Sequence, residues 1–435
     1  MKERMRKMGV KVIIVGGGWS GCAASISAKK AGADVTLLER ADMLLGTGLV
    51  GGIMRNNGRF TATEEAIAMG GNELFDAADA AARHRNMEFP GHKHASLYDV
   101  AKIEPVVQQK LNEAGVDWYL EARFTSAVME GKKIKAVKTQ DGDLFEGDVF
   151  VDCTGTAGPQ YNCVKYGNGC AMCELRCPSF GPRVSLAEKA GAHEFMGKKG
   201  DGSFGAMSGS CKLFKESLSD EICKELNAKG VAVIPIPEKL RKTNSLGKKA
   251  CQQYALPEFE QNVILLDTGH AKMMTPFYPL EILRQIPGFE SARYEDPYSG
   301  SKGNSMRYMA VSYRDNNLKV EGVDNLFCGG EKAGLLVGHT EAIVTGLLAG
   351  ANAARFACGK ELITIPVSLA IGDAIDHVGK QMRTAEGITL KYTFSGSVYF
   401  QRMKELGLYT IDKDAIKAKV KEAGMENIYN QKICG

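Results

Sequence analysis

The sequence has no long hydrophobic run and little net charge. Within 435 residues, 55 Lys and Arg are balanced by 51 Asp and Glu, which leaves a net charge of +4. Such a small excess indicates no bulk attraction to nucleic acid or to an anionic membrane surface. The longest apolar stretches are interrupted by glycine or by a charge such as Glu341, so none reaches the roughly 20 residues that span a bilayer. We therefore expect neither a membrane protein nor a nucleic-acid-binding protein, and we predict a cytoplasmic location.

Aromatic residues and cysteines are also sparse. Aromatic residues make up 8% of the chain, and 12 cysteines are too few for a disulfide scaffold. The apolar fraction of 44% is that of a globular protein, and a length of 435 residues predicts two or three domains. The composition therefore predicts a folded, soluble protein.

A glycine motif near the amino end predicts a dinucleotide site. Strands at 12–15 and 35–38 and a helix at 20–31 surround a G-x-G-x-x-G motif. In this context the glycines permit a tight turn and admit a pyrophosphate to the backbone at the amino terminus of the helix. A carboxylate at the end of the second strand is placed to bind ribose hydroxyls, which argues against NADP. The predicted site comprises Gly16, Gly18, Trp19, Ser20, Gly21, Glu39 and Arg40.

Two later strands predict that the dinucleotide is FAD. Residues 151–156 and 325–331 each read as a buried strand that runs into small residues, and both resemble segments of two-dinucleotide-fold flavoproteins. The resemblance implies that the first segment closes over the dinucleotide and that the second binds the ribityl chain. A helix that begins near residue 338 would direct its amino terminus at the flavin. These segments add five residues to the predicted site, namely Thr154, Gly155, Gly330, Glu331 and Gly338.

The order of elements predicts an α/β fold of the two-dinucleotide-fold flavoprotein type. We expect a Rossmann-like FAD-binding domain in two parts, residues 1–160 and 308–360, around an inserted α+β domain at 161–307 that bears cysteines and faces the substrate. Residues 361–435 read as a small helical cap that includes a capped helix at 413–423. Helices at 63–82 and 97–114, and a hairpin turn at Asp141 and Gly142, complete this prediction.

The carboxyl half resembles a known group of flavoproteins. Residues 286–292, 325–330, 338–341 and 346–355 are similar to the folate- and FAD-dependent tRNA uracil-5-methyltransferases and the related glucose-inhibited division flavoproteins, and the first 160 residues resemble FAD-dependent oxidoreductases more broadly. The resemblance implies FAD and a methyl transfer that uses two cysteines, one in the amino-terminal glycine loop and one before a Pro-hydrophobe-Glu triplet. Neither cysteine is present: none occurs between Glu39 and Asn57, and Phe277 stands where the second would be.

Four clustered cysteines predict a metal site. Their spacing ends in the C-x2-C-x3-C-P pattern of ferredoxin runs, so we predict one [4Fe–4S] cluster near the flavin. Structural zinc, redox-active thiols and the absence of any ligand are the alternatives. The predicted ligands are Cys163, Cys170, Cys173 and Cys177.

Candidates for acid–base chemistry are few. His339 and Glu341 begin the helix that is directed at the flavin, where they could exchange a proton or could simply be helix-start residues. Lys332, beside the late strand, could stabilise an anionic reduced flavin or be solvated.

These features predict an FAD-dependent oxidoreductase. We expect it to pass electrons between the flavin and an iron–sulfur cluster or a small-molecule substrate. One alternative is a folate- and flavin-dependent methyltransferase that acts on RNA or another acceptor, and another is a non-enzymatic flavin or cluster sensor or assembly protein. An electron-transfer partner protein and a homo-oligomer are left open.

Overall fold

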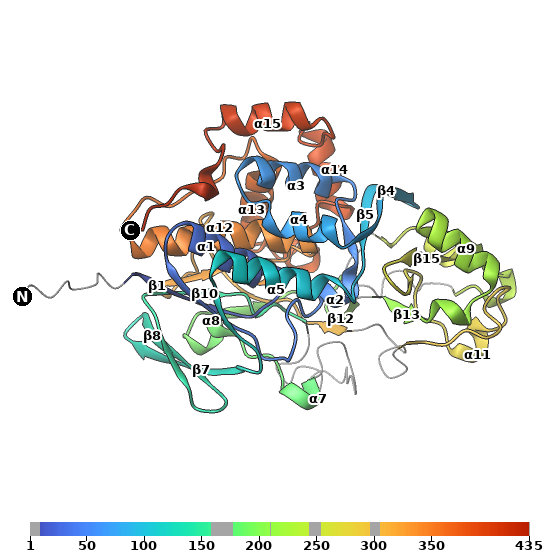
Figure 1. Cartoon of the computed structure of the whole chain (residues 1–435), viewed down its shortest axis with the longest axis horizontal. Coiled ribbons are helices and arrows are strands. Elements are labelled where there is room, and N and C mark those ends of the chain that lie inside the picture. The colour runs from blue at the N-terminus through green and yellow to red at the C-terminus, as the bar shows by residue number, and fades with distance from the viewer. Residues whose placement is uncertain (1–8, 158–176, 209, 243–253, 296–304, 435) are drawn as a thin grey trace, which may run out of the picture.

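A five-stranded parallel sheet forms the centre of the protein (Figure 1). The computed structural model describes residues 9–157, 177–208, 210–242, 254–295 and 305–434. The sheet has the order β19-β10-β1-β2-β6, and its strands are β1 (Lys11–Val15), β2 (Asp34–Leu38), β6 (Asp117–Tyr119), β10 (Val149–Asp152) and β19 (Leu326–Cys328). Every neighbouring pair is parallel, and β1 and β10 are almost wholly buried, as expected for a sheet between layers. The predicted α/β class is confirmed.

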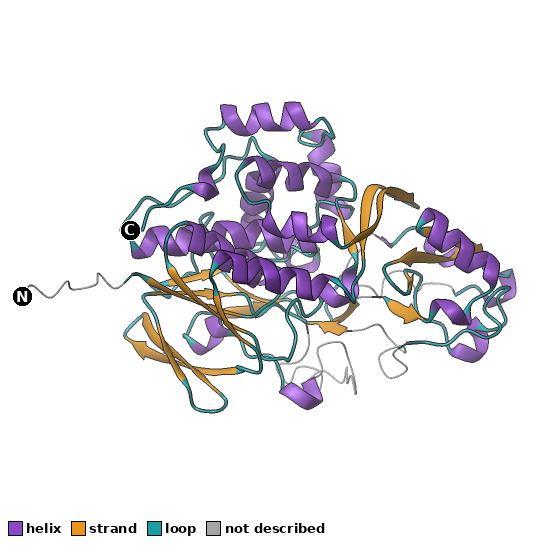
Figure 2. Ribbon diagram, viewed as in Figure 1, coloured by secondary structure: helices purple, strands orange, loops and turns teal. Residues whose placement is uncertain are grey.

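Two helices pack together beside this sheet along a seam of small residues (Figure 2). They are α1 (Trp19–Lys30) and α12 (His339–Ala357). A side chain at Gly346 would meet the backbone of Ser20, and one at Gly350 would meet the backbone of Ala24. Because both contacts advance by four residues, the two helices run in the same direction. Their amino termini therefore point toward the same end of the sheet.

Antiparallel strands flank the parallel sheet. A three-stranded sheet consists of β7 (Phe124–Glu130), β8 (Lys133–Thr139) and β9 (Leu144–Glu146). The turn between β8 and β9 contains Gly142 with a φ of 97°, which confirms the predicted hairpin turn. Two smaller pairs join β11 (Glu194–Met196) to β18 (Ala310–Ser312) and β12 (Ala206–Ser208) to β17 (Ser305–Arg307).

A second domain contains a four-stranded antiparallel sheet. Its order is β13 (Cys211–Leu213), β16 (Ala271–Met273), β15 (Asn262–Asp267) and β14 (Val231–Pro235). The helices α9 (Asp220–Lys229) and α11 (Leu280–Leu283) share one apolar core with this sheet. A second apolar core joins the sheet to β3 (Ile53–Met54), β4 (Ala82–Phe89) and β5 (His92–Tyr98). The inserted segment thus has the α+β character that the sequence predicted.

The division between the two domains differs in detail from the sequence pattern. Leu186 and Ala187 of α8 (Leu186–Lys189), and Ala190 after it, are buried in the same core as the parallel sheet. The pair of β11 with β18 continues this core. Residues 186–196 therefore pack with the first domain, although they follow residue 160 in the chain.

Two predicted helices differ from the observed elements. The stretch 97–114 is the end of strand β5 followed by α5 (Ile103–Ala114), because residues 99–102 form a turn between them. The stretch 63–82 contains α3 (Gly58–Ala68) and α4 (Glu73–Ala80), which are interrupted at Gly70 with a φ of 91° and at Gly71. The remaining short helices are α2 (Gly48–Gly51), α7 (Cys177–Phe180) and α10 (Glu258–Gln261).

Three helices form the carboxyl-terminal cap, namely α13 (Ala370–Gln381), α14 (Ser397–Glu405) and α15 (Lys413–Glu422). The side chain of Asp412 accepts hydrogen bonds from the N–H groups of Asp414 and Ala415 at the start of α15, as predicted. A disulfide between Cys358 and Cys434, which the sequence analysis did not pair, attaches the end of the cap to the end of α12.

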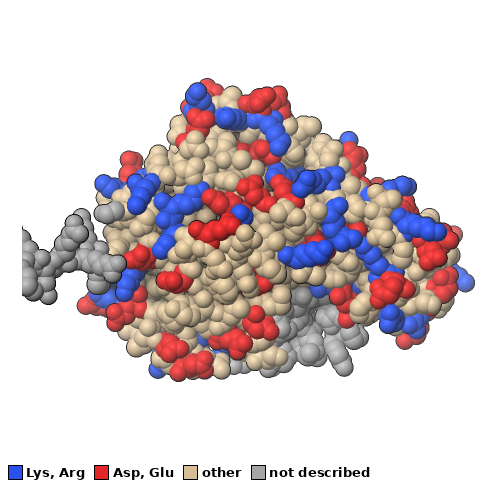
Figure 3. Space-filling view, viewed as in Figure 1, with Lys and Arg blue, Asp and Glu red and all other residues tan. Residues whose placement is uncertain are grey.

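The surface and the helices agree with the composition. Basic and acidic side chains are intermixed over the face seen in Figure 3, in keeping with a net charge of +4. Among the helices of the described residues, none has the length and apolarity needed to cross a bilayer.

Candidate functional site

A large open cavity lies at the carboxyl ends of the parallel strands β1, β2, β10 and β19. It encloses about 1430 Å³, its open mouth included. This edge of an α/β sheet is where such folds bind dinucleotides. All but one of the predicted cofactor-binding residues line it, namely Gly16, Gly18, Trp19, Ser20, Glu39, Arg40, Thr154, Gly155, Gly330, Glu331 and Gly338.

The glycine motif leaves space for a ligand at the start of α1. Gly16 has a φ of 105°, which a residue with a side chain rarely adopts. A side chain at Gly18 would meet no atom of the described residues within 4 Å. No side chain caps the first turn of α1, and Gly18, Trp19 and Ser20 at its start line the cavity. Gly21 lies outside the wall and allows close packing instead, because a side chain there would collide with the carbonyl of Gly16. The geometry fits a pyrophosphate.

The carboxylate of Glu39 is fixed at the end of β2. It accepts a hydrogen bond from the N–H of Gly17 at 2.7 Å and another from the N–H of Ala41 at 2.9 Å. These bonds hold the carboxylate in the cavity wall. This position suits a group that accepts hydrogen bonds from ribose hydroxyls.

The neighbouring Arg40 connects this end of the cavity to the cysteine segment. Its guanidinium donates to the carbonyl of Gly181 at 2.5 Å and to Sγ of Cys177 at 3.7 Å. Arg123 donates from Nε to the carbonyl of Pro182 at 2.9 Å. Cys177 is therefore attached beside Glu39, at the end of β2.

The other three predicted cluster ligands, Cys163, Cys170 and Cys173, lie outside the described residues. Within the ranges that the structure does describe, no group of His, Cys, Asp or Glu is arranged to hold a metal ion.

The imidazole of His339 lies in the cavity wall at the amino terminus of α12. Its Nδ1 is 3.2 Å from the hydroxyl of Tyr98, and that hydroxyl donates to the carbonyl of Gly48 at 2.6 Å. Desolvation lowers the pKa of His339 well below its ordinary value, and the positive charges of Arg59 and Lys272 lower it further. The imidazole is therefore neutral near pH 7, and its surroundings disfavour a second proton.

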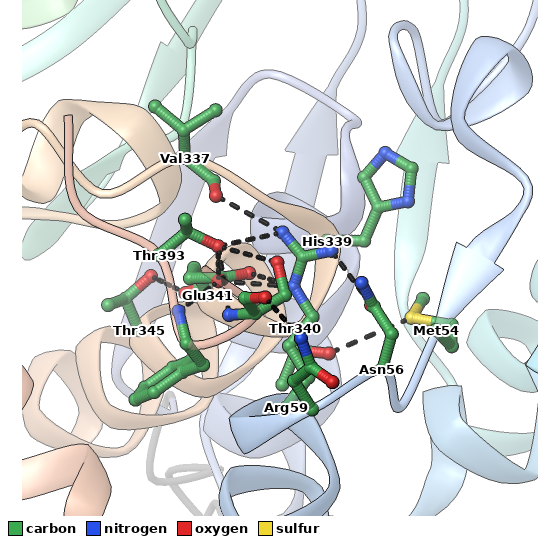
Figure 4. Close-up of polar contacts among 12 residues, drawn as sticks. Met54, Asn56, Arg59, Val337, His339, Thr340, Glu341, Thr345 and Thr393 are labelled. Carbon is green, nitrogen blue, oxygen red and sulfur yellow. Dashed lines mark hydrogen bonds and ion pairs between the residues drawn. The ribbon is translucent and has the colours of Figure 1, made fainter. Parts of the chain in front are cut away.

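Glu341 faces away from the cavity. It forms a buried ion pair with Nε of Arg59 at 3.0 Å and accepts hydrogen bonds from the hydroxyl of Thr393 at 2.7 Å and the N–H of Phe394 at 2.8 Å. Figure 4 shows Glu341 within this polar cluster, whereas the imidazole of His339 is turned away from it. The cluster joins α12 to α3 and to the carboxyl-terminal cap. Glu341 thus positions the helix that carries His339.

Lys332 also lies outside the cavity wall. Its Nζ forms an ion pair with Glu194 and donates to the hydroxyl of Ser185 at 2.9 Å and to the carbonyl of Ala310 at 3.1 Å. Its side chain is almost wholly buried. This lysine connects β18 to the segment around α8, and the structure does not bring it to the predicted flavin position.

Sequence reasoning missed the wall that the second domain contributes. Its residues Ser210, Tyr254, Lys272 and Met274 line the same cavity as His339 of α12. The ammonium of Lys272 donates to the carbonyl of Val50 at 2.5 Å, across the boundary between the domains. A lysine within the buried strand β16 is the signal that could have identified it, since an isolated buried charge is rare without a partner.

Two family models match parts of this chain, and solved structures share its fold. The family model described as FAD dependent oxidoreductase matches residues 11–158, and that described as glucose inhibited division protein A matches residues 214–361. The structure of GidA from Aquifex aeolicus in its form II crystal has a TM-score of 0.68 and 17% identity over 95% of this chain and 76% of that chain. The structure of the same GidA in its form I crystal has a TM-score of 0.60 and 16% identity, and the match covers 95% of this chain and 78% of that chain.

Curated relatives match a shorter segment. The methylenetetrahydrofolate–tRNA-(uracil-5-)-methyltransferase TrmFO of Bacillus pumilus (strain SAFR-032) is 31% identical over 152 residues, which are 34% of this chain and 32% of the relative. TrmFO of Exiguobacterium sp. (strain ATCC BAA-1283 / AT1b) is 30% identical over 156 residues, which are 35% of this chain and 31% of the relative. The matched segment spans about a third of the length of these relatives.

The chain has the fold of GidA, with a cavity at the edge of the sheet where such folds bind dinucleotides. Two segments of the chain match family models of FAD-dependent oxidoreductases and of glucose inhibited division protein A, and the chain is similar to the GidA and TrmFO group, which confirms the resemblance seen in the sequence.

Proposed function

We propose that this protein is an FAD-dependent enzyme that reduces a small electrophilic substrate in the cavity between its two domains. One observation carries the proposal: residues from four strand ends line one cavity, and the same cavity continues past His339 to a wall of the second domain. Bound FAD supplies hydride and single-electron transfer. The cavity has room for a substrate beside it.

The residues of the chain have separate tasks in this proposal. The start of α1, open at Gly18, holds the pyrophosphate, and Glu39 binds the ribose of the adenosine. The amino terminus of α12 lies at the flavin end, where its dipole favours negative charge. There the neutral imidazole of His339, held through Nδ1 by the hydroxyl of Tyr98, offers a hydrogen bond to the flavin or the substrate.

A folate-borne one-carbon unit is the substrate that the relatives favour. The TrmFO relatives carry methylenetetrahydrofolate in their names. Reduction of a methylene group is a reaction that a reduced flavin performs, so this substrate and the proposed site are chemically compatible. This is why the folate- and flavin-dependent alternative ranks above electron exchange with an iron–sulfur cluster.

This chain lacks the two cysteines that the family resemblance implies for the methylation of uracil. A side chain at Gly51 in the glycine loop would overlap with the imidazole of His339. In the described part of the cavity wall the thiol is Cys153, and burial raises its pKa, which makes it a poor nucleophile. We therefore propose that the reduced one-carbon product is released or passed to an acceptor without a cysteine adduct.

The experiment uses the purified holoprotein under anaerobic conditions. The flavin is first reduced, methylenetetrahydrofolate is then added, and the return of oxidised flavin absorbance is followed together with methyltetrahydrofolate by mass spectrometry. Labelled folate with bulk tRNA forms a second arm. Return of absorbance with methyltetrahydrofolate supports the proposal, and transfer of label to RNA extends it to methylation. Protein that binds no FAD would refute it.

Electron exchange with a [4Fe–4S] cluster is the second candidate. It is favoured by the cysteine pattern and by the contact of Cys177 with Arg40, which lines the cavity. Iron and acid-labile sulfide are measured in anaerobically purified protein, with Cys173→Ser as the comparison. FAD without iron or sulfide would eliminate this candidate and leave the first intact.

A further inference from the structure

The hydroxyl of Tyr98 lies between the glycine loop and the ring of His339. Tyr98 ends strand β5 and is wholly buried, and its hydroxyl donates to the carbonyl of Gly48 at 2.6 Å. The same oxygen lies 3.2 Å from Nδ1 of His339. Of the two rings, His339 lines the cavity and Tyr98 does not. The hydroxyl therefore holds the imidazole from behind the cavity wall.

The chemistry of these three groups determines where their hydrogen atoms lie. A carbonyl oxygen can only accept, so the single hydroxyl hydrogen of Tyr98 points at Gly48. The hydroxyl then offers only lone pairs to His339, and Nδ1 must donate to it. Desolvation and neighbouring cations lower the pKa of His339 and keep its imidazole neutral, so its two nitrogens share one proton. With that proton on Nδ1, Nε2 carries a lone pair.

Packing keeps the ring of His339 in this orientation. The backbone of Gly51 covers the edge at Cε1, where a side chain would overlap with the ring. The rings of Trp19 and Tyr98 each lie 6.2 Å from the imidazole, measured between ring centres. A half-turn of the ring would bring a carbon to the hydroxyl of Tyr98 and lose the hydrogen bond. Since Nδ1 faces Tyr98 and Cε1 faces Gly51, the edge with Nε2 is left for the cavity that His339 lines.

We propose that Tyr98 is a positioning residue that fixes His339 with a hydrogen-bond acceptor, Nε2, directed at the flavin end of the cavity. This inference rests on the proposed function, because that function places FAD and its substrate there. A fixed acceptor selects a ligand group that donates a hydrogen bond over one that can only accept. Two sources supply such an N–H group, a reduced flavin and a substrate that carries one.

The alternative is that Tyr98 only anchors the glycine loop through Gly48. The carbonyl of Thr47 also accepts a hydrogen bond from the ring of the histidine, and a proton on Nε2 that is donated to this carbonyl would reverse the assignment. Tyr98→Phe separates these roles, because it removes the hydroxyl and keeps the aromatic ring. The matched control is Tyr294→Phe, since the hydroxyl of Tyr294 donates to the carbonyl of Tyr278 at 2.7 Å in the second domain.

The test is nuclear magnetic resonance of the holoprotein with ¹⁵N-labelled histidine, which reports the position of the proton on each of the seven imidazoles. The signal of His339 is the one that His339→Gln lacks. We expect a ring protonated at Nδ1 and not at Nε2 near neutral pH. Tyr98→Phe should lower the ratio of the Nδ1-protonated to the Nε2-protonated ring by roughly tenfold, the effect of one lost hydrogen bond. Tyr294→Phe should leave this ratio unchanged.

The same spectra identify the source of the donor. A shift of the Nε2 signal when the flavin is reduced assigns the donor to the flavin. A shift that occurs only when methylenetetrahydrofolate is added assigns it to the substrate. If neither treatment moved the signal, the acceptor role of Nε2 would be wrong.

Two further outcomes would overturn the inference. A wild-type ring of His339 protonated at Nε2 contradicts the assigned hydrogen positions, and an unchanged ratio in Tyr98→Phe reduces Tyr98 to an anchor of the glycine loop. If Tyr98→Phe does not accumulate, the wild-type spectrum decides alone. Absence of FAD from the wild type would instead contradict the proposed function, and the position of the proton on His339 can be measured in that protein as well.

Discussion

The imidazole of His339 occupies the space that a side chain at Gly51 would need. Gly51 ends the short helix α2 in the glycine loop, and His339 begins α12, so the contact joins the two segments that bound the flavin end of the cavity. Only one of these two positions can carry a large side chain. The side chain that fills this end of the cavity is therefore an imidazole rather than a group from the glycine loop.

Replacement of Gly51 by alanine should force His339 out of its position. We expect Gly51→Ala to lower the free energy of unfolding by about 1–3 kcal/mol, the usual cost of overpacking. The double variant Gly51→Ala/His339→Ala should recover most of this loss, which denaturant unfolding of both single variants and the double variant measures. Additive effects of the two substitutions would contradict the contact. Gly200→Ala, in an exposed loop with open space, serves as the control.

A valine at Gly18 should prevent FAD binding without unfolding the protein. The space around this position is open, so the side chain would be accommodated but would occupy the place of the pyrophosphate. We expect Gly18→Val to be purified colourless with a circular dichroism spectrum like that of the wild type, whereas the control Gly200→Val keeps its FAD. If the Gly18→Val protein kept a full complement of FAD, the cofactor would not bind at Gly18.

Loss of the charge of Glu341 should destabilise the protein strongly. The carboxylate is buried against the guanidinium of Arg59, which would be left without its counter-ion. Breaking a buried pair from one side costs about 3–5 kcal/mol, so Glu341→Gln should lower the free energy of unfolding by that amount. The double variant Arg59→Met/Glu341→Gln should cost less than the sum of the single changes. If the loss of unfolding free energy in the double variant equalled the sum of the two single losses, Arg59 and Glu341 would not be coupled.

Glu65 should make the stability depend on pH between about 4.5 and 7. Its carboxylate accepts the N–H groups of Ala370 and Ile371 at the start of α13, but burial raises its pKa from 4.5 to about 7. A raised pKa means that the folded state favours the proton. The contribution of protonated Glu65 to the free energy of unfolding is thus complete below pH 4.5. It is lost as the pH rises through 7, by about 3 kcal/mol in total.

The measurement compares unfolding free energies of wild type and Glu65→Gln from pH 4.5 to pH 8. The difference between them should change with pH over this range, whereas the difference for Glu422→Gln, at an exposed position of α15, should not. Parallel pH profiles for wild type and Glu65→Gln would refute the assignment.

Reduction of the disulfide between Cys358 and Cys434 should lower thermal stability. The bridge closes a loop with a sequence separation of 76, for which chain entropy predicts about 4 kcal/mol. A thiol reductant and Cys434→Ser should lower the melting temperature to the same extent, and the reductant should have no further effect on the variant. Cys223→Ser, at a free cysteine, is the control. A melting temperature unchanged by reductant would show that the bridge contributes nothing.

The dinucleotide cradle was predictable because its signals are local. The glycine motif, Glu39 and the small residues at 154–155 and 329–330 each follow directly from the end of a strand. Parallel strands bring such ends to one edge of the sheet, so sequence neighbours of each strand suffice to assemble the site.

Helical geometry explains why one of the two α12 candidates is absent from the cavity. His339 and Glu341 are two residues apart, and a helix turns by about 200° over that interval. When His339 faces the cavity, Glu341 must face the core, where it meets Arg59. The periodicity of an α-helix alone therefore predicts that only one of these two side chains faces the cavity.

The contribution of Lys272 was not predictable in the same way. It reaches the cavity through the packing of the second domain on the first, and its partner Val50 is 222 residues away in the chain. Lys332 was predicted to lie beside the flavin, but it is buried elsewhere. Its partners are Glu194 of β11 and Ser185 before α8, which are distant from it in the chain. No local pattern encodes either set of contacts.

The seam between α1 and α12 gives the cavity one fixed side. Gly346 and Gly350 press these helices together, so the two amino termini that face the cofactor cannot separate without opening the core. The opposite side, with Lys272, is attached to the fixed side by a second apolar cluster and by the hydrogen bond to Val50. The two sides of the cavity thus differ in how they are held, one by helix packing within the core of the parallel sheet and the other by an apolar cluster and a hydrogen bond between the domains.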